Sequence, residues 1–206
     1  MSELYSCPRA RFVRPGGGDE TVDWSECASV LLAHAATGQP PREETQVQCC
    51  WSPDRFYVRF LCRDTHAASK FENRDDPLYE QDVVELFLDE EGLGRKYLEL
   101  EVSPRNVVFD AWVENDGVDR VTKLDKEWDL EGLRTSVRLT DSDCREYLIS
   151  IPASHFAAPL VSGVRWRANF YRIDEDAAGV REFQAWRPTG KINFHIPSRF
   201  GTIELA

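Results

Sequence analysis

The sequence predicts an all-β protein, a single antiparallel, jelly-roll-like β-sandwich of about ten strands that occupies residues 1–206. Three observations support this fold class. Apolar and polar residues alternate with a period of two along much of the chain, as they do in half-buried strands. Clusters of Gly, Pro, Asp and Ser bound these runs, and strands do not alternate with helical segments. Short strands separated by turns are typical of sandwiches and jelly rolls.

The first part of the chain is the least regular. Residues 1–43 contain Gly and Pro clusters, and the segment 27–36 within them could form either a short helix or an apolar strand. Regular alternation begins in the run 45–51. Ser52-Pro53-Asp54 then turns the chain. The next run, 56–63, has the same period and is predicted to be the hairpin partner.

The central part of the chain is predicted to be a three-stranded meander formed by the runs 82–89, 96–103 and 107–114. In the first two runs, one face is purely aliphatic and the other carries acidic side chains. Because one face of an antiparallel sheet commonly packs on the core, we expect the aliphatic face to be buried. Its residues are Val84, Leu86, Leu88, Leu98, Leu100 and Val102.

The remaining strands follow the same pattern of short runs bounded by turn-forming residues. A single short helical turn is expected at 152–156. The five further strands are predicted at 133–140, 145–151, 164–174, 182–186 and 199–205.

Charge and hydropathy exclude several function classes. The formal net charge is −11 and the isoelectric point is near 4.9, and the basic residues are dispersed, so nucleic acid is not expected as a partner. The chain contains no apolar run near the roughly 20 residues that cross a bilayer, and its start lacks a signal-peptide core. We therefore expect no membrane association and a cytoplasmic location as written, or a secreted or periplasmic one if a leader has been removed.

The usual motifs of catalytic and metal sites are missing from the sequence. The six cysteines form no Cys-x-x-Cys pair and are predicted to be reduced, small buried residues. The four histidines are scattered, no Gly-x-Ser-x-Gly elbow is present, and Gly16 to Gly18 are not followed by the Lys-Ser/Thr of a phosphate-binding loop. A haem module is a further alternative for a sandwich, but the one methionine is Met1, so a Met/His axial pair cannot form.

The acidic face of the meander allows three interpretations. Glu85 lies on one predicted strand, and Glu99 and Glu101 lie on its expected neighbour about 4.8 Å away. Glu85 with Glu99 or Glu101 could be the carboxylate pair of a glycoside hydrolase. The same face could simply be solvated. In the third interpretation, the ionised carboxylates accept hydrogen bonds from sugar hydroxyls.

Two aromatic residues in polar loops bear on this choice. Tyr79 precedes the strand at 82–89 by three residues, and Phe194 lies in the irregular stretch 190–197. Aromatic rings in such loops commonly contact a ligand, and two opposed rings would make a slot for a sugar. Each ring could instead pack its loop onto the sandwich.

Several stretches together resemble the family-9 carbohydrate-binding modules. They are 76–87, 97–104, 169–173, 185–189 and 194–201, and they occur in the order and spacing of that family. The resemblance covers roughly the chain from Thr45 onward. It implies a β-sandwich that grips a terminal sugar of a plant-type polysaccharide or oligosaccharide, such as xylan or cellulose, between two aromatic rings.

The resemblance also implies a set of binding residues. By position, Tyr79 and Phe194 look like the two rings, which are tryptophan in sugar-binding members, and Glu85 matches a hydrogen-bonding carboxylate. Glu101 falls where those members carry a basic residue, and Lys191 falls where they carry an amide, so the sugar preference is expected to differ. The implied carbohydrate-binding set is Tyr79, Phe194, Glu85, Glu101 and Tyr171.

The resulting functional prediction is non-catalytic binding of an oligosaccharide or polysaccharide, with no catalytic residues and an accessory role in glycoside hydrolysis. No cofactor or metal site is expected. Some members of the resembling family carry structural calcium, but no compact ligand loop here matches theirs. The acids that could hold such an ion are Asp75, Asp76 and Asp82, or Asp125, Glu127 and Asp129.

Overall fold

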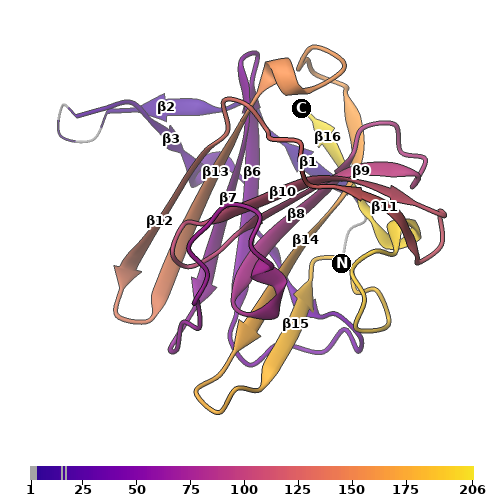
Figure 1. Ribbon diagram of the computed structural model, residues 1–206. Helices are drawn as coiled ribbons and strands as arrows, with labels where there is room; N and C mark the ends of the chain where they lie inside the picture. The colour runs from indigo at the N-terminus through magenta and orange to yellow at the C-terminus, as the bar shows by residue number, and fades with distance from the viewer. Residues whose placement is uncertain (1–3, 15, 17) are drawn as a thin grey trace.

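The protein is a two-layer β-sandwich with a small side hairpin, as seen in a computed structural model that describes residues 4–14, 16 and 18–206 (Figure 1). The larger sheet consists of β1 (Leu4–Cys7), β5 (Ala33–His34), β8 (Val83–Asp89), β9 (Lys96–Val102), β10 (Val108–Asn115), β11 (Val121–Asp125), β14 (Arg165–Glu175), β15 (Arg181–Ala185) and β16 (Gly201–Leu205). The smaller sheet consists of β4 (Val30–Leu31), β6 (Thr45–Ser52), β7 (Arg55–Arg63), β12 (Arg134–Asp141) and β13 (Cys144–Pro152).

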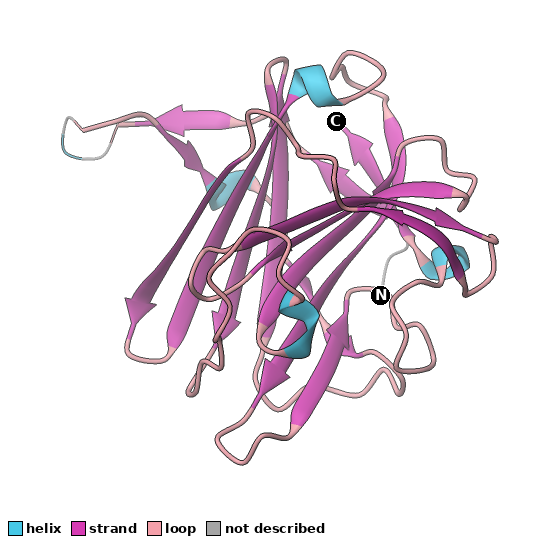
Figure 2. Cartoon of the chain, in the orientation of Figure 1, coloured by secondary structure: helices cyan, strands magenta, loops and turns pink. Residues whose placement is uncertain are grey.

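The projecting hairpin is formed by β2 (Arg11–Val13) and β3 (Thr21–Asp23), and it extends away from both sheets (Figure 1). Within the described residues, helical structure is limited to short single turns (Figure 2). These are η2 (Trp24–Glu26), η3 (Leu78–Glu80), η4 (Ala153–His155) and η5 (Pro197–Arg199). The all-β sandwich is therefore confirmed.

Most of the predicted elements are present, and the differences lie mainly in the number of strands. The described residues contain sixteen strands rather than about ten, because β1, β2, β3 and β11 lie where no strand was predicted and β4 and β5 lie in the undecided segment 27–36. The segment 27–36 forms two short strands, not a helix. The sandwich is also not purely antiparallel, since β1 pairs with β16 in the parallel sense.

The central meander has the predicted order and register. β8, β9 and β10 are antiparallel neighbours, and Glu85 lies directly opposite Glu101. A slip of one residue would turn every side chain of a strand to the other face. The observed register puts the aliphatic set inward and the acids on the outer face, as predicted.

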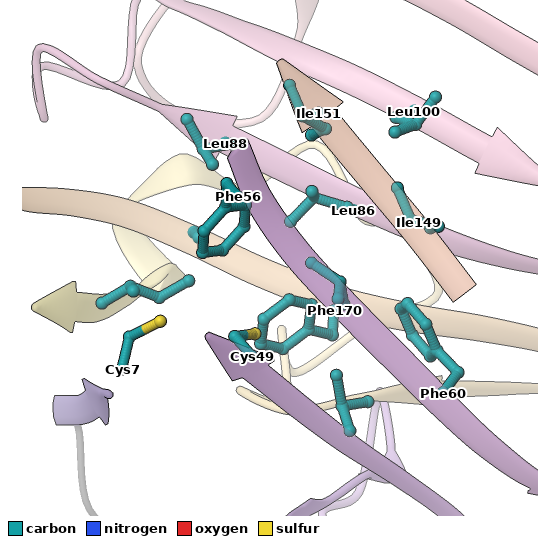
Figure 3. Close-up of a cluster of buried hydrophobic side chains, with 14 of the residues drawn as sticks. Cys7, Cys49, Phe56, Phe60, Leu86, Leu88, Leu100, Ile149, Ile151 and Phe170 are labelled. Atoms are coloured by element: carbon teal, nitrogen blue, oxygen red, sulfur yellow. The ribbon is translucent and has the colours of Figure 1, made fainter. Parts of the chain in front are cut away.

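The main core lies between the two sheets. Leu86, Leu88, Leu100 and Phe170 of the larger sheet lie in one buried cluster with Phe56, Phe60, Ile149 and Ile151 of the smaller sheet (Figure 3). All six predicted core residues of β8 and β9 are buried, each at most 2% exposed. Removing one such leucine side chain leaves a cavity that costs about 2 to 5 kcal/mol.

The outer face of the larger sheet is also covered, which corrects the expectation that it might be solvated. All seven residues of β8 are buried, on both of its faces. Leu78 of η3 and the side chains of Phe194 and Phe200 pack on the outer face, together with Phe87 and Tyr97 of the sheet. The acidic side chains of this face therefore lie in a second apolar cluster, not in water.

Candidate functional site

A cleft of about 460 Å³ lies on the outer face of the larger sheet. Glu85, Glu99 and Glu101 line it together with the rings of Tyr79 and Phe194. The predicted arrangement, in which both rings lie on the same side of the fold as Glu85, is therefore present. The rest of the lining is largely apolar and is contributed by β8, β10, β11, β14, β15 and the stretch 192–195.

Tyr79 is held in place by the helical turn η3. The neighbouring Leu78 is buried at 1% exposure and anchors the turn in the outer cluster. The Arg181 guanidinium donates hydrogen bonds of 3.3 Å to the main-chain oxygens of Tyr79 and Glu80. The Tyr79 ring remains 51% exposed and is free to contact a ligand.

Phe194 differs from Tyr79 because it is mostly buried, at 8% exposure. Its ring stacks on the ring of Tyr171, with 4.1 Å between centroids and 12° between planes. The Tyr171 hydroxyl donates a 2.9 Å hydrogen bond to the Phe194 main-chain oxygen and accepts one of 2.9 Å from the Asn169 amide. Tyr171 is fully buried and does not line the cleft, which corrects its predicted place among the ligand-contacting residues. It positions Phe194 instead.

The three glutamates meet at the cleft because of strand register. Glu85 and Glu101 face each other across β8 and β9, and Glu99 follows on the same face of β9, opposite Phe87. One carboxylate oxygen of each glutamate lies within 4.8 Å of the others. Glu85, Glu99 and Glu101 are 1%, 6% and 0% exposed, respectively. Oε1 of Glu85 and both carboxylate oxygens of Glu101 accept no hydrogen bond from the described residues.

Burial dominates the electrostatics of this cluster. It raises the pKa of Glu99 to about 8, since the charged form is poorly solvated there. Burial, and then the charge of Glu99, raises the pKa of Glu85 well above its usual range. Burial, and then the charges of Glu85 and Glu99, raise the pKa of Glu101 well above its usual range. The cluster therefore favours protonation or a positively charged partner.

His195 also lines the cleft and was not among the predicted site residues. Its Nδ1 is hydrogen-bonded at 2.9 Å to the Tyr97 hydroxyl, which also accepts a hydrogen bond from the Asn115 amide. Nε2 lies 3.9 Å from Oε1 of Glu99. Burial lowers the pKa of His195 to about 4, so the ring is neutral at neutral pH. Its place next to Phe194 in sequence was the one available signal.

The other acids considered at the sequence level serve local structure. The Asp82 carboxylate accepts hydrogen bonds from the main-chain N–H groups of Ala68 and Glu175. Asp76 accepts from the N–H groups of Glu72 and Asn73. In the described part of the chain, neither predicted calcium set brings three acids within reach of one ion, whereas the three glutamates of the cleft do so.

Lys191, at the position where sugar-binding relatives carry an amide, forms an ion pair of 2.6 Å with Asp119 and does not line the cleft. This lysine therefore provides no charge to balance the glutamates.

The described residues also include no helix long and apolar enough to span a membrane.

The fold and the cleft define a β-sandwich domain with a ligand cleft on the outer face of one sheet. The sequence identifies the family. A family model described as "Carbohydrate family 9 binding domain-like" matches residues 16–206, and the chain belongs to this family. The predicted membership, and with it the class of non-catalytic carbohydrate-binding domains, is confirmed.

Relatives agree with this assignment at the level of the fold. A family-9 carbohydrate-binding module of Caldicellulosiruptor kristjanssonii in complex with cellotriose has a TM-score of 0.70 at 19% identity, covering 98% of this chain and 93% of that one. The structure of such a module from the same organism in complex with glucose has a TM-score of 0.68 at 19% identity, with coverage of 98% and 94%. A protein of Arthroderma benhamiae described as "Extracellular protein" is 24% identical over 177 residues, which is 80% of each chain.

The family result disfavours the alternative that Glu85 acts with Glu99 or Glu101 as a glycoside hydrolase pair. The geometry gives a physical reason as well. A retaining glycosidase needs one carboxylate that stays ionised beside one that holds a proton. Here, burial raises the pKa of all three glutamates, so their environments do not separate two such roles.

Proposed function

We propose that the cleft binds a terminal sugar of a cellulose- or xylan-type polysaccharide or oligosaccharide, between the rings of Tyr79 and Phe194. The observation that carries the proposal is the convergence, in one cleft, of two aromatic rings from distant loops with buried carboxylate oxygens that lack donors. A flat ring can lie against the C–H face of a pyranose while polar groups accept its hydroxyls.

The two rings have different roles in this proposal. Phe194 is fixed by stacking on Tyr171 and by the hydrogen bond to its main chain, so it offers a preformed surface. Tyr79 is half exposed and closes on the sugar from the solvent side. The unpartnered oxygens of Glu85 and Glu101 are the acceptors for sugar hydroxyls.

The test is calorimetric titration with cello- and xylo-oligosaccharides of wild-type protein, Tyr79→Ala and a control. Phe12→Ala is the matched control, because Phe12 is 41% exposed and lies on the side hairpin away from the cleft. We expect Tyr79→Ala to weaken binding by about 1 to 3 kcal/mol, by analogy with base-stacking aromatic residues, and Phe12→Ala to leave it unchanged. Equal affinities for all three proteins would exclude stacking on Tyr79.

The enzyme alternative is tested with the same substrates. Incubation with xylan and cello-oligosaccharides should release no new reducing ends, because the glutamates of the cleft are not separated into an acid and a nucleophile. Release that disappears in Glu85→Gln would instead establish hydrolysis.

The ligand proposal also bears on location. An extracellular position brings the domain to plant-type polysaccharides, and a relative is described as extracellular. Five of the six cysteines are buried, so their thiols are shielded in an oxidising compartment. Fractionation of the native organism should place the protein outside the cytoplasm, and recovery in the cytoplasmic fraction would contradict this.

A further inference from the structure

The three glutamates of the cleft have the spacing of ligands to a single metal ion. Oxygen ligands lie 2.3 to 2.6 Å from a bound Ca²⁺, so two oxygens on opposite sides of one ion are about 4.8 Å apart. One carboxylate oxygen each of Glu85, Glu99 and Glu101 lies within 4.8 Å of the other two. All three side chains are thus within reach of one ion between β8 and β9.

A second observation points to a missing positive partner. Glu85 and Glu101 are 1% and 0% exposed, and three of their four carboxylate oxygens have no well-aligned hydrogen bond from the described residues. The Tyr79 main-chain N–H and the Glu99 carboxyl group lie near Glu101, but neither carries a positive charge. Buried polar atoms normally have partners, and an unpaired buried carboxylate is costly.

The positively chargeable groups of the cleft do not supply this partner. His195 approaches only Glu99, with 3.9 Å between its Nε2 and Oε1 of Glu99, and none of the unpartnered oxygens of Glu85 and Glu101. The Arg181 guanidinium is held by the main-chain oxygens of Tyr79 and Glu80 and lies over the ring of Phe183. Among the described residues, no arginine or lysine forms an ion pair with any of the three glutamates.

We propose that Glu85, Glu99 and Glu101 bind one oxygen-preferring divalent cation of the Ca²⁺ and Mn²⁺ type at the floor of the cleft. The donor set consists only of carboxylate oxygens, which suits hard cations and disfavours metals that prefer sulfur or imidazole. A divalent ion also balances three carboxylates better than a singly charged ammonium group would.

The cation would face the ligand. The three glutamates line the same cleft as Tyr79 and Phe194, so the coordination positions that the protein leaves open point into it. Neighbouring hydroxyls of a sugar are suitable oxygen ligands for those positions. This second step rests on the proposed function, whereas the cation site itself does not.

The experiment titrates Mn²⁺ into chelator-treated protein without sugar and follows free Mn²⁺ by electron paramagnetic resonance. Glu101→Gln replaces a charged ligand with a neutral amide, and Glu114→Gln is the matched control, because Glu114 is an exposed acid on the adjacent strand β10. We expect one Mn²⁺ per chain, displaced by Ca²⁺, with affinity at least about tenfold weaker in Glu101→Gln and within about twofold of wild type in Glu114→Gln.

Two outcomes overturn the cation site: no saturable Mn²⁺ binding, or equal weakening in both variants. Circular dichroism checks the fold, and Glu85→Gln replaces Glu101→Gln if the latter does not fold. A calcium-dependent rise in melting temperature of the wild type, retained in Glu114→Gln, gives a readout independent of the titration.

Calorimetry with cello-oligosaccharide, in Ca²⁺ and in chelator, then tests the coupling. Higher sugar affinity in Ca²⁺ supports the shared site, and equal affinity overturns the coupling. Sugar binding by a protein that binds no Mn²⁺ would overturn the cation site and leave the proposed function in place. The two failures are therefore distinguishable.

Discussion

The two faces of β8 and β9 differ in what their burial achieves. The inner face is purely aliphatic and packs against the smaller sheet, so its burial stabilises the fold. The outer face is covered almost as completely, yet it buries three glutamates without balancing cations among the described residues. Burial of that kind opposes folding and leaves acceptors free for a ligand. One pair of strands thus stabilises the fold on one face and, in the proposed function, binds the ligand on the other.

The largest effect is expected on the inner face. Leu86→Ala should lower the free energy of unfolding by about 2 to 5 kcal/mol, because Leu86 is fully buried between the sheets and its removal leaves a cavity. Denaturant unfolding measures this. A loss below about 1 kcal/mol would mean that the core collapses around the site or packs less tightly than described.

The outer face should respond in the opposite direction. Glu101→Met keeps the length of the side chain but removes two buried oxygens that lack partners. In cation-free buffer we expect the free energy of unfolding to rise by about 1 to 3 kcal/mol while sugar affinity falls. Destabilisation by Glu101→Met would show that Glu101 has a stabilising partner, and the contrast between the faces would fail.

This contrast also shows how far the sequence could be interpreted. The alternation of aliphatic residues was enough to predict the inner face, the register and the neighbouring strands. It could not show that the outer acids are buried, since the covering residues come from distant segments: Leu78 in η3 and Phe194 near the end of the chain. The alternation of residues within a strand predicts which side chains share a face, but it does not predict which distant segments cover that face.

The same limit applies to the candidate site. Tyr79, Phe194, Glu85 and Glu101 were brought together by resemblance, and the structure places all four around one cleft. Tyr171 was assigned to the ligand, but a buried strand residue can act only through the ring that it supports. Glu99, which the sequence offered only as a member of a carboxylate pair, joins the cleft through strand register, and His195, which was assigned no role, joins it through a loop.

A smaller effect should show whether Tyr171 positions Phe194 for sugar binding or has only a structural role. Tyr171→Phe keeps the stacked ring but removes the hydrogen bond to the Phe194 main chain, at a cost of about 1 kcal/mol in stability. If Tyr171 positions Phe194, sugar affinity should fall by a few-fold even though no ligand contact is lost. Unchanged affinity beside reduced stability would limit Tyr171 to a structural role.

A further effect of similar size, confined to acid pH, concerns a half-buried histidine away from the cleft. His155 stacks on Trp112 at 5.6 Å and 18°, and burial lowers its pKa from 6.5 to about 4. The unfolded chain therefore binds a proton between these pH values that the folded chain does not, so stability is lost as pH falls from 6.5 toward 4. In His155→Phe this loss should be smaller by roughly 1 to 2 kcal/mol, after allowance for partial solvent screening. Unfolding curves at pH 7 and pH 4.5 check the difference, and parallel losses in both proteins would contradict it.

The most direct test of the account locates the sugar on the molecule. We would titrate ¹⁵N-labelled protein with cellotriose and follow the amide resonances of both sheets. The account predicts that the largest shifts occur at Tyr79, Glu85, Glu101 and Phe194, on the outer face of the larger sheet, with little change along β6, β7, β12 and β13. Shifts confined to the smaller sheet, or none at saturating sugar, would contradict it.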